Sequence, residues 1–146
     1  MKNKILSFVL VLILFSLLPS LTLAQVQTRV RVIQASNVGK AIDPSLRDLH
    51  DQLGSLFNFT SYRLLRDEIV ILSPNQPASV STHKGRSIEI TQVGFQRNIA
   101  ELRVRIRRDG RDILNTQVRL SPGRTVLIGG PKHGEGVVIL ALSANF

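Results

Sequence analysis

A segment near the middle of the chain alternates strictly between apolar and charged residues. The apolar positions are Leu102, Val104 and Ile106, and the charged positions are Glu101, Arg103, Arg105 and Arg107. Successive side chains of a β-strand point to opposite faces, so this period of two predicts a strand with one buried and one solvated face. Asp109-Gly110 follows, a dipeptide typical of tight hairpin turns, and residues 113–120 supply the returning strand. The sequence therefore predicts an antiparallel hairpin.

Similar patterns predict strands elsewhere in the chain. In residues 29–33, Val30 and Val32 are expected to face the core while Arg29 and Arg31 face water. Residues 62–72 predict a strand pair or one bent strand, whose apolar second half is covered on both faces. Three more strands are predicted over residues 86–93, 125–128 and 137–142, and the last of these, apolar on both faces, is expected to be central. Residues 129–136 are expected to form a flexible hairpin tip.

One helix is predicted between the first two strands. Asp43 is a suitable N-cap, and Pro44 suits the first helical position. Apolar residues then recur at spacings of three and four, which places one apolar stripe against a sheet, namely Leu46, Leu49, Leu53, Leu56 and Phe57. The expected fold is a β-rich α+β domain with about seven short, mostly antiparallel strands. It is a sandwich or a roll with one amphipathic helix after the first strand.

The first 24 residues predict a cleavable signal peptide. Lys2 and Lys4 precede an uncharged apolar run over residues 5–18, and small residues precede a cleavage site between Ala24 and Gln25. An uncleaved anchor is the alternative, but the run is shorter than the roughly 20 residues that span a bilayer. We therefore expect one small domain over residues 25–146, exported to the periplasm or the extracellular space, with no membrane span in its mature form. The chain has no Cys, which excludes disulfides and a lipidated N-terminal Cys.

The expected mature domain is basic. Without Lys2 and Lys4, 17 of the 19 basic residues remain against 10 acidic ones, a net charge of +7, and 14 of the 17 are arginines. Arg103, Arg105 and Arg107 project from one strand face, and Arg119 lies on the strand paired with it. This predicts a cationic patch for an anionic partner. A solvated face interleaved with Glu89 and Glu101 is the alternative. Nucleic acid is an unsuitable partner because the aromatic residues that stack on bases are scarce.

No motif in the sequence supplies recognisable catalysis, and no cofactor is expected. His133 and Glu135 are too few for a metal site, which normally needs three or four ligands. Lys132 follows a glycine-rich stretch but lacks the Ser or Thr and the helix of a phosphate-binding loop. A small hydrolase would have to combine a Ser and Asp groups with His50 or His83, which the sequence neither supports nor excludes.

The stretch Val118-Arg-Leu-Ser-Pro-Gly-Arg-Thr-Val-Leu-Ile-Gly-Gly130 resembles the strand-turn-strand signature of bacterial outer-membrane secretins. Residues 46–72 are similar to the helix-then-strand unit of the periplasmic modules that precede secretin pores. The resemblance implies a protein accessory to a secretion or pilus assembly. The leading hypothesis is a non-enzymatic interaction module of the cell envelope that binds envelope proteins. The alternatives are a protein that binds an anionic envelope polymer through the arginine-rich strand face, and a small hydrolase.

Overall fold

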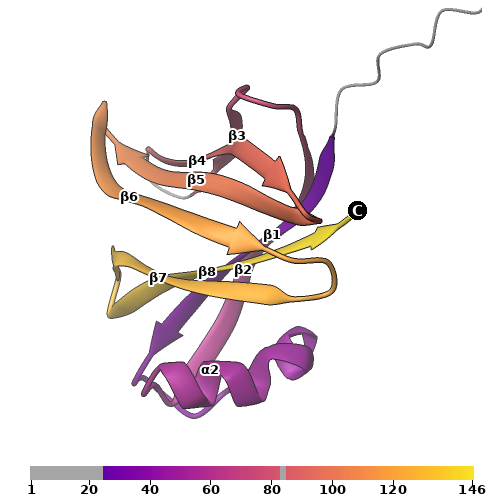
Figure 1. The fold of residues 1–146 in the computed structure, drawn as a ribbon. Coiled ribbons are helices and arrows are strands. Elements are labelled where there is room, and N and C mark those ends of the chain that lie inside the picture. Colours follow the sequence, from indigo (N-terminus) through magenta and orange to yellow (C-terminus); the bar gives the residue numbers. More distant parts are fainter. Residues whose placement is uncertain (1–24, 83–84) are drawn as a thin grey trace, which may run out of the picture.

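The chain folds as a β-sandwich with a helical segment packed outside it. The structure, a computed structural model, describes residues 25–82 and 85–146. Within this part, eight strands form two four-stranded antiparallel sheets, and the helical segment follows the first strand (Figure 1). This confirms the predicted fold class. The predicted leader with Ala24 lies outside the described residues, as does His83, and Gln25 is the first residue described.

The first sheet has the strand order β2-β1-β8-β7. Its strands are β1 (Val26–Ser36), β2 (Ser61–Leu72), β7 (Thr125–His133) and β8 (Gly136–Asn145). β8 lies between β1 and β7, as its apolar character on both faces predicts. In the described residues, no helix has the length and apolar character needed to cross a membrane.

The second sheet has the strand order β3-β4-β5-β6. Its strands are β3 (Ala78–Ser81), β4 (Arg86–Gln96), β5 (Ile99–Arg108) and β6 (Arg111–Leu120). Asp109 and Gly110 connect β5 to β6, and their φ angles of 51° and 76° are both positive. This is the turn geometry that matches the twist of paired strands, and it confirms the predicted hairpin.

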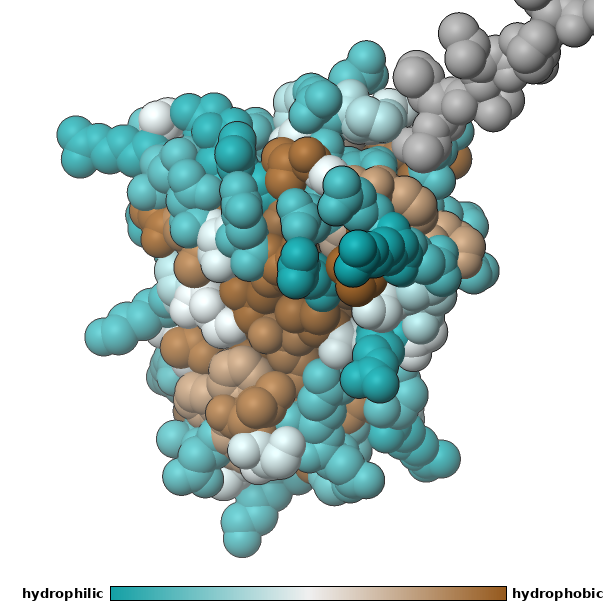
Figure 2. All heavy atoms as spheres, in the orientation of Figure 1, coloured by the Kyte–Doolittle hydropathy of each residue, from teal (hydrophilic) through white to brown (hydrophobic). Residues whose placement is uncertain are grey.

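The chain changes sheets twice, from β2 to β3 and from β6 to β7. β6 and β7 are edge strands of different sheets, so no ladder of hydrogen bonds joins them. Hydrophobic residues gather on the molecular surface between these two strands (Figure 2). Leu114 and Val118 of β6 and Val126 of β7 are partly buried and pack against the main core.

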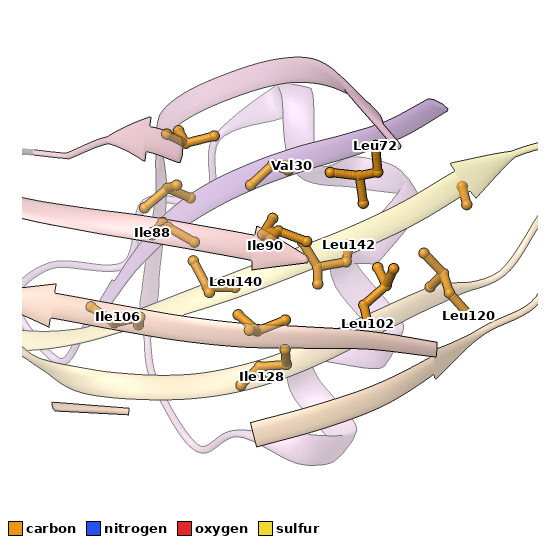
Figure 3. Close-up of a cluster of buried hydrophobic side chains, with 14 of the residues drawn as sticks. Val30, Leu72, Ile88, Ile90, Leu102, Ile106, Leu120, Ile128, Leu140 and Leu142 are labelled. Atoms are coloured by element: carbon orange, nitrogen blue, oxygen red, sulfur yellow. The ribbon is translucent and has the colours of Figure 1, made fainter. Parts of the chain in front are cut away.

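The main core lies between the two sheets. Strands of both sheets contribute its fully buried side chains, including Val30, Leu140 and Leu142 from the first sheet and Ile90 and Leu102 from the second (Figure 3). Burying an aliphatic side chain stabilises the folded state by about 1.5–3 kcal/mol, so this cluster holds the sheets together without disulfides.

A second, smaller core lies on the outer face of the first sheet. A 3-10 helix, η1 (Pro44–Leu49), leads into the α-helix α2 (His50–Leu56). The Asp43 side chain caps η1 by accepting a hydrogen bond from the Ser45 amide at 3.0 Å. Leu46, Leu49 and Leu53 are buried against the sheet as predicted, but Leu56 is 59 % exposed. Leu56 stays outside because its helix ends there.

Residues 62–72 form one strand, β2, with an irregularity where its pairing to β1 shifts register, which is the second of the two predicted alternatives. Two other predictions were wrong, the covered second half of this strand and the loop over residues 129–136. β2 is an edge strand, and its second half lies beyond the end of the sheet that the helices cover, so Ile69 and Ile71 are 62 % and 63 % exposed rather than covered. The predicted loop over residues 129–136 is mostly strand, because β7 continues through an irregularity to His133. The turn itself is only Gly134-Glu135.

Candidate functional site

The arginines singled out by the sequence lie together on the outer face of the second sheet. Arg103, Arg105 and Arg107 alternate on β5 with residues buried in the core. Arg119 lies on β6, directly opposite Glu101 of β5. The hairpin therefore brings all four arginines onto one surface.

Carboxylates neutralise most of this arginine face. Arg105 contacts Glu89, a contact that raises the pKa of the guanidinium. Arg107 lies 3.0 Å from Asp112, and Arg119 lies 3.1 Å from Glu101. Within the described residues, Arg103 alone of the four has no carboxylate within ion-pair distance. Three acidic residues thus oppose four arginines, an arrangement typical of a solvated sheet face.

A cavity of about 470 Å³ lies between the two sheets at one end of the sandwich. Its floor consists of core side chains that are almost fully buried, namely Val32 and Val138 from the first sheet and Ile88 and Ile106 from the second. Ile88 and Ile106 mark this end of the core in Figure 3, opposite Leu72 and Leu120. Such a volume is typical of pockets that bind small molecules, about 300–1,000 Å³.

The rim of the cavity is cationic. Arg63 and Arg66 of β2 and Arg86 of β4 line it together with His133 of β7. Arg66 lies 3.3 Å from Glu68. Arg63 and Arg86 have no carboxylate within ion-pair distance among the described residues. Two positive charges at the mouth therefore lack an ionic partner.

Neutral groups hold these two arginines in place. The Arg63 guanidinium donates to Gln34 Oε1 at 2.8 Å, and Gln34 Nε2 donates to the His133 carbonyl at 3.2 Å. The Arg86 guanidinium donates to the Lys132 carbonyl at 2.8 Å. Because Arg86 lies on β4 and Lys132 on β7, this bond ties the two sheets together at the mouth. A guanidinium has five donors, so each arginine keeps donors for a further acceptor.

Sequence reasoning missed this site. Arg63 and Arg66 fall in the polar stretch of β2, and Arg86 stands more than a dozen residues later on another sheet. Their proximity depends on which edge of one sheet faces which edge of the other, and that follows from the crossover between β2 and β3. The sequence did contain one signal of the site. Apolar residues stand beside each arginine, and they place each arginine at the end of a row of residues that face the core.

Arg31 contradicts its prediction as well. It was expected to face water, yet its side chain is only 2 % exposed because η1 covers it. Its guanidinium donates to both oxygens of Asp48 on η1, at 2.9 and 2.8 Å. The hydrogen bonds from Arg31 lower the pKa of the Asp48 carboxyl. This bidentate pair fixes the helical segment to the sheet, and it lies apart from the cavity.

The described histidines belong to no group that could hold a metal ion. His50 is exposed on α2, where Nδ1 lies 3.7 Å from Asp51. His133 lines the cavity beside Ser81 and Thr82, but the Thr82 hydroxyl donates to the Arg86 carbonyl at 3.1 Å. Across residues 25–82 and 85–146, no group of three or more His, Asp or Glu side chains could hold a metal ion.

The secretin-like stretch, residues 118–130, spans the end of β6, the crossover and the first part of β7. Its two strands belong to different sheets. Comparisons of the chain with protein-family models, with curated proteins and with solved structures found no match. The secretin resemblance stays a prediction.

Proposed function

We propose that this chain is an exported, non-enzymatic binding module of the cell envelope, and that it binds an anionic group at the mouth between its two sheets. The leader-like residues 1–24 support export, and the secretin-like stretch supports a place beside a secretion or pilus assembly. The observation that carries the binding proposal is the cavity, where Arg63 and Arg86 stand over an apolar floor and have no ionic partner among residues 25–82 and 85–146.

An oxyanion suits this arrangement for a physical reason. Arginine binds carboxylates and phosphates through two parallel hydrogen bonds, and such charge-assisted bonds are about twice as strong as neutral ones. Gln34 and the Lys132 carbonyl position the guanidinium groups without cancelling their charge. A cleft with low-dielectric walls also concentrates the electric field of the charges at its mouth. The cavity therefore attracts an anion more strongly than the neutralised arginine face does.

The lining favours binding over catalysis. Among the described residues no Asp or Glu lines the cavity, so the lining offers no carboxylate as a general acid, a general base or a nucleophile. The residues that surround the cavity supply charge, donors and apolar surface, which are the components of a binding site.

Butyl phosphate, a small oxyanion ester, tests the proposal in an NMR titration of the full chain. Replacing both Arg63 and Arg86 with Gln should weaken its binding about tenfold or more, because two charge-assisted contacts are lost. The matched control replaces Arg103 and Arg119 with Gln, which removes the same charge from the arginine face. The control should change the affinity less than twofold.

Equal losses in the two variants would show that net charge, not the cavity, attracts the anion, and would overturn the proposal. The same samples test the non-enzymatic part. Butyl phosphate should be recovered intact, and release of inorganic phosphate that depends on His133 would contradict it.

A further inference from the structure

The cavity is larger than a bound anion would need. Its mouth is cationic, whereas its interior is apolar. The arginines stand at the rim, where Arg63 is exposed and Arg86 is half-buried. The floor side chains Val32, Ile88 and Ile106 are at most 2 % exposed. An oxyanion held at the rim would leave most of the 470 Å³ and all of this apolar floor unoccupied by ligand.

Apolar side chains from both sheets line the cavity below the rim. Leu65 of β2 and Pro131 of β7 contribute from the first sheet, beside Val138 of β8, and Ile106 of β5 faces them from the second. Gly130 packs closely against two of these residues, because a Cβ there would lie 3.3 Å from Ile106 Cδ1 and 3.0 Å from the Val138 carbonyl oxygen. The cavity thus runs from two cations that have no carboxylate partner in the described part of the chain to an apolar lining that favours an apolar group.

We infer that the ligand is a single-chain amphiphile with an oxyanion head, such as a fatty acid or a single-chain phosphate ester. The inference rests on the proposed function, and it adds the apolar half of the ligand. The head binds Arg63 and Arg86, and the alkyl chain lies along Ile88, Ile106 and Val138 between the sheets. A polyanionic envelope polymer has no apolar part to fill this space, so it matches the cavity less well.

The length of the ligand's alkyl chain is the variable that tests this inference. Binding of butyl, hexyl, octyl and decyl phosphate to the full chain is measured by isothermal titration calorimetry, with each ester below its micelle concentration. Each buried methylene should increase affinity up to about fourfold until the cavity is full. We expect at least a tenfold gain from butyl to octyl phosphate, followed by a plateau. Decanoate, measured beside decyl phosphate, distinguishes a carboxylate from a phosphate head.

Two protein variants distinguish binding of the ligand's oxyanion head from binding of its alkyl chain. Arg63→Gln with Arg86→Gln should weaken every ester by a similar factor while the gain with chain length persists. Ile106→Phe narrows the cavity, so it should reduce the gain in affinity from butyl to octyl phosphate. A circular dichroism spectrum and a urea midpoint like those of the unaltered chain show that this variant is folded. If Ile106→Phe fails to fold, the series on the unaltered chain still decides the inference.

The outcomes distinguish the two proposals. If butyl phosphate binds at the cavity arginines and affinity is constant along the series, the amphiphile inference is wrong and the proposed function stands. If no ester binds, both are wrong. If affinity rises with chain length but Ile106→Phe does not alter the rise, the alkyl chain binds elsewhere and the inference is overturned.

Discussion

Replacing Asp48 with Ala should destabilise the domain because the substitution removes the hydrogen-bond acceptors of the buried Arg31 side chain. The Arg31 side chain is 2 % exposed, and Asp48, which is 57 % exposed, supplies both of its acceptors. Arg31 Nε is already without an acceptor. The substitution therefore leaves a buried guanidinium with no hydrogen-bond acceptor among the described residues.

The expected loss lies between two limits. Breaking a fully buried ion pair costs about 3–5 kcal/mol, whereas an exposed pair contributes about 0–1 kcal/mol. Because water reaches the Asp48 side of this pair, we expect Asp48→Ala to lower the free energy of unfolding by about 2 kcal/mol. Arg31→Met removes the charge and keeps an apolar side chain of similar length. Adding it to Asp48→Ala should restore part of the lost stability.

Equilibrium urea unfolding followed by circular dichroism measures these differences. A loss of about 2 kcal/mol moves the urea midpoint by roughly 1 M for a domain of this size. Asp67→Ala is the control, because its pair with Arg29 is 34 % and 43 % exposed and should contribute less than about 1 kcal/mol. The reasoning is refuted if Asp48→Ala is no more destabilising than Asp67→Ala, or if the double variant loses as much as the two single losses added together.

Three further predictions follow from local geometry and charge. Gly136→Ala should lower the free energy of unfolding in urea by about 3 kcal/mol or more, because its Cβ would overlap the Ala35 carbonyl oxygen. An unchanged midpoint would contradict the close approach of β8 to β1. Gly110→Val should cost about 2 kcal/mol in thermal unfolding, because φ is 76° there, and a stable variant would show that the turn is not of the assigned type. Hydrogen bonds from arginine lower the pKa of both Asp48 and Asp67, so their contribution to stability is complete above about pH 4 and is lost as pH falls through the folded-state values. Unfolding measured from pH 6 to pH 2 should therefore show less acid sensitivity in Asp48→Asn than in the unaltered chain.

Local patterns predicted most of the fold because each depends on neighbouring residues. The alternation around Val104 and the Asp109-Gly110 turn specify the β5–β6 hairpin without reference to the rest of the chain. The apolar faces of residues 137–142 likewise predicted a central strand, since such a strand must be covered on both sides.

The site was harder to predict because it depends on contacts between distant segments. Arg31 alternates with valines like any solvated strand residue, and only the position of η1 makes it buried. Arg103 and Arg63 are both arginines on strands, but sheet pairing places carboxylates around the neighbours of Arg103, and the sandwich places an apolar cavity beside Arg63. A period-two pattern shows which face of a strand a residue occupies. It does not show which residues of other segments lie opposite that residue.

Methyl NMR of the full chain during a titration with octyl phosphate tests the central claim most directly, because it locates the ligand on the molecule. The account predicts chemical-shift changes at the methyl groups of Ile88, Ile106 and Val138, with none at the outward-facing Ile69 and Ile71. Changes confined to the backbone amides of Arg103, Arg105 and Arg119, with the cavity methyl groups unaltered, would contradict it.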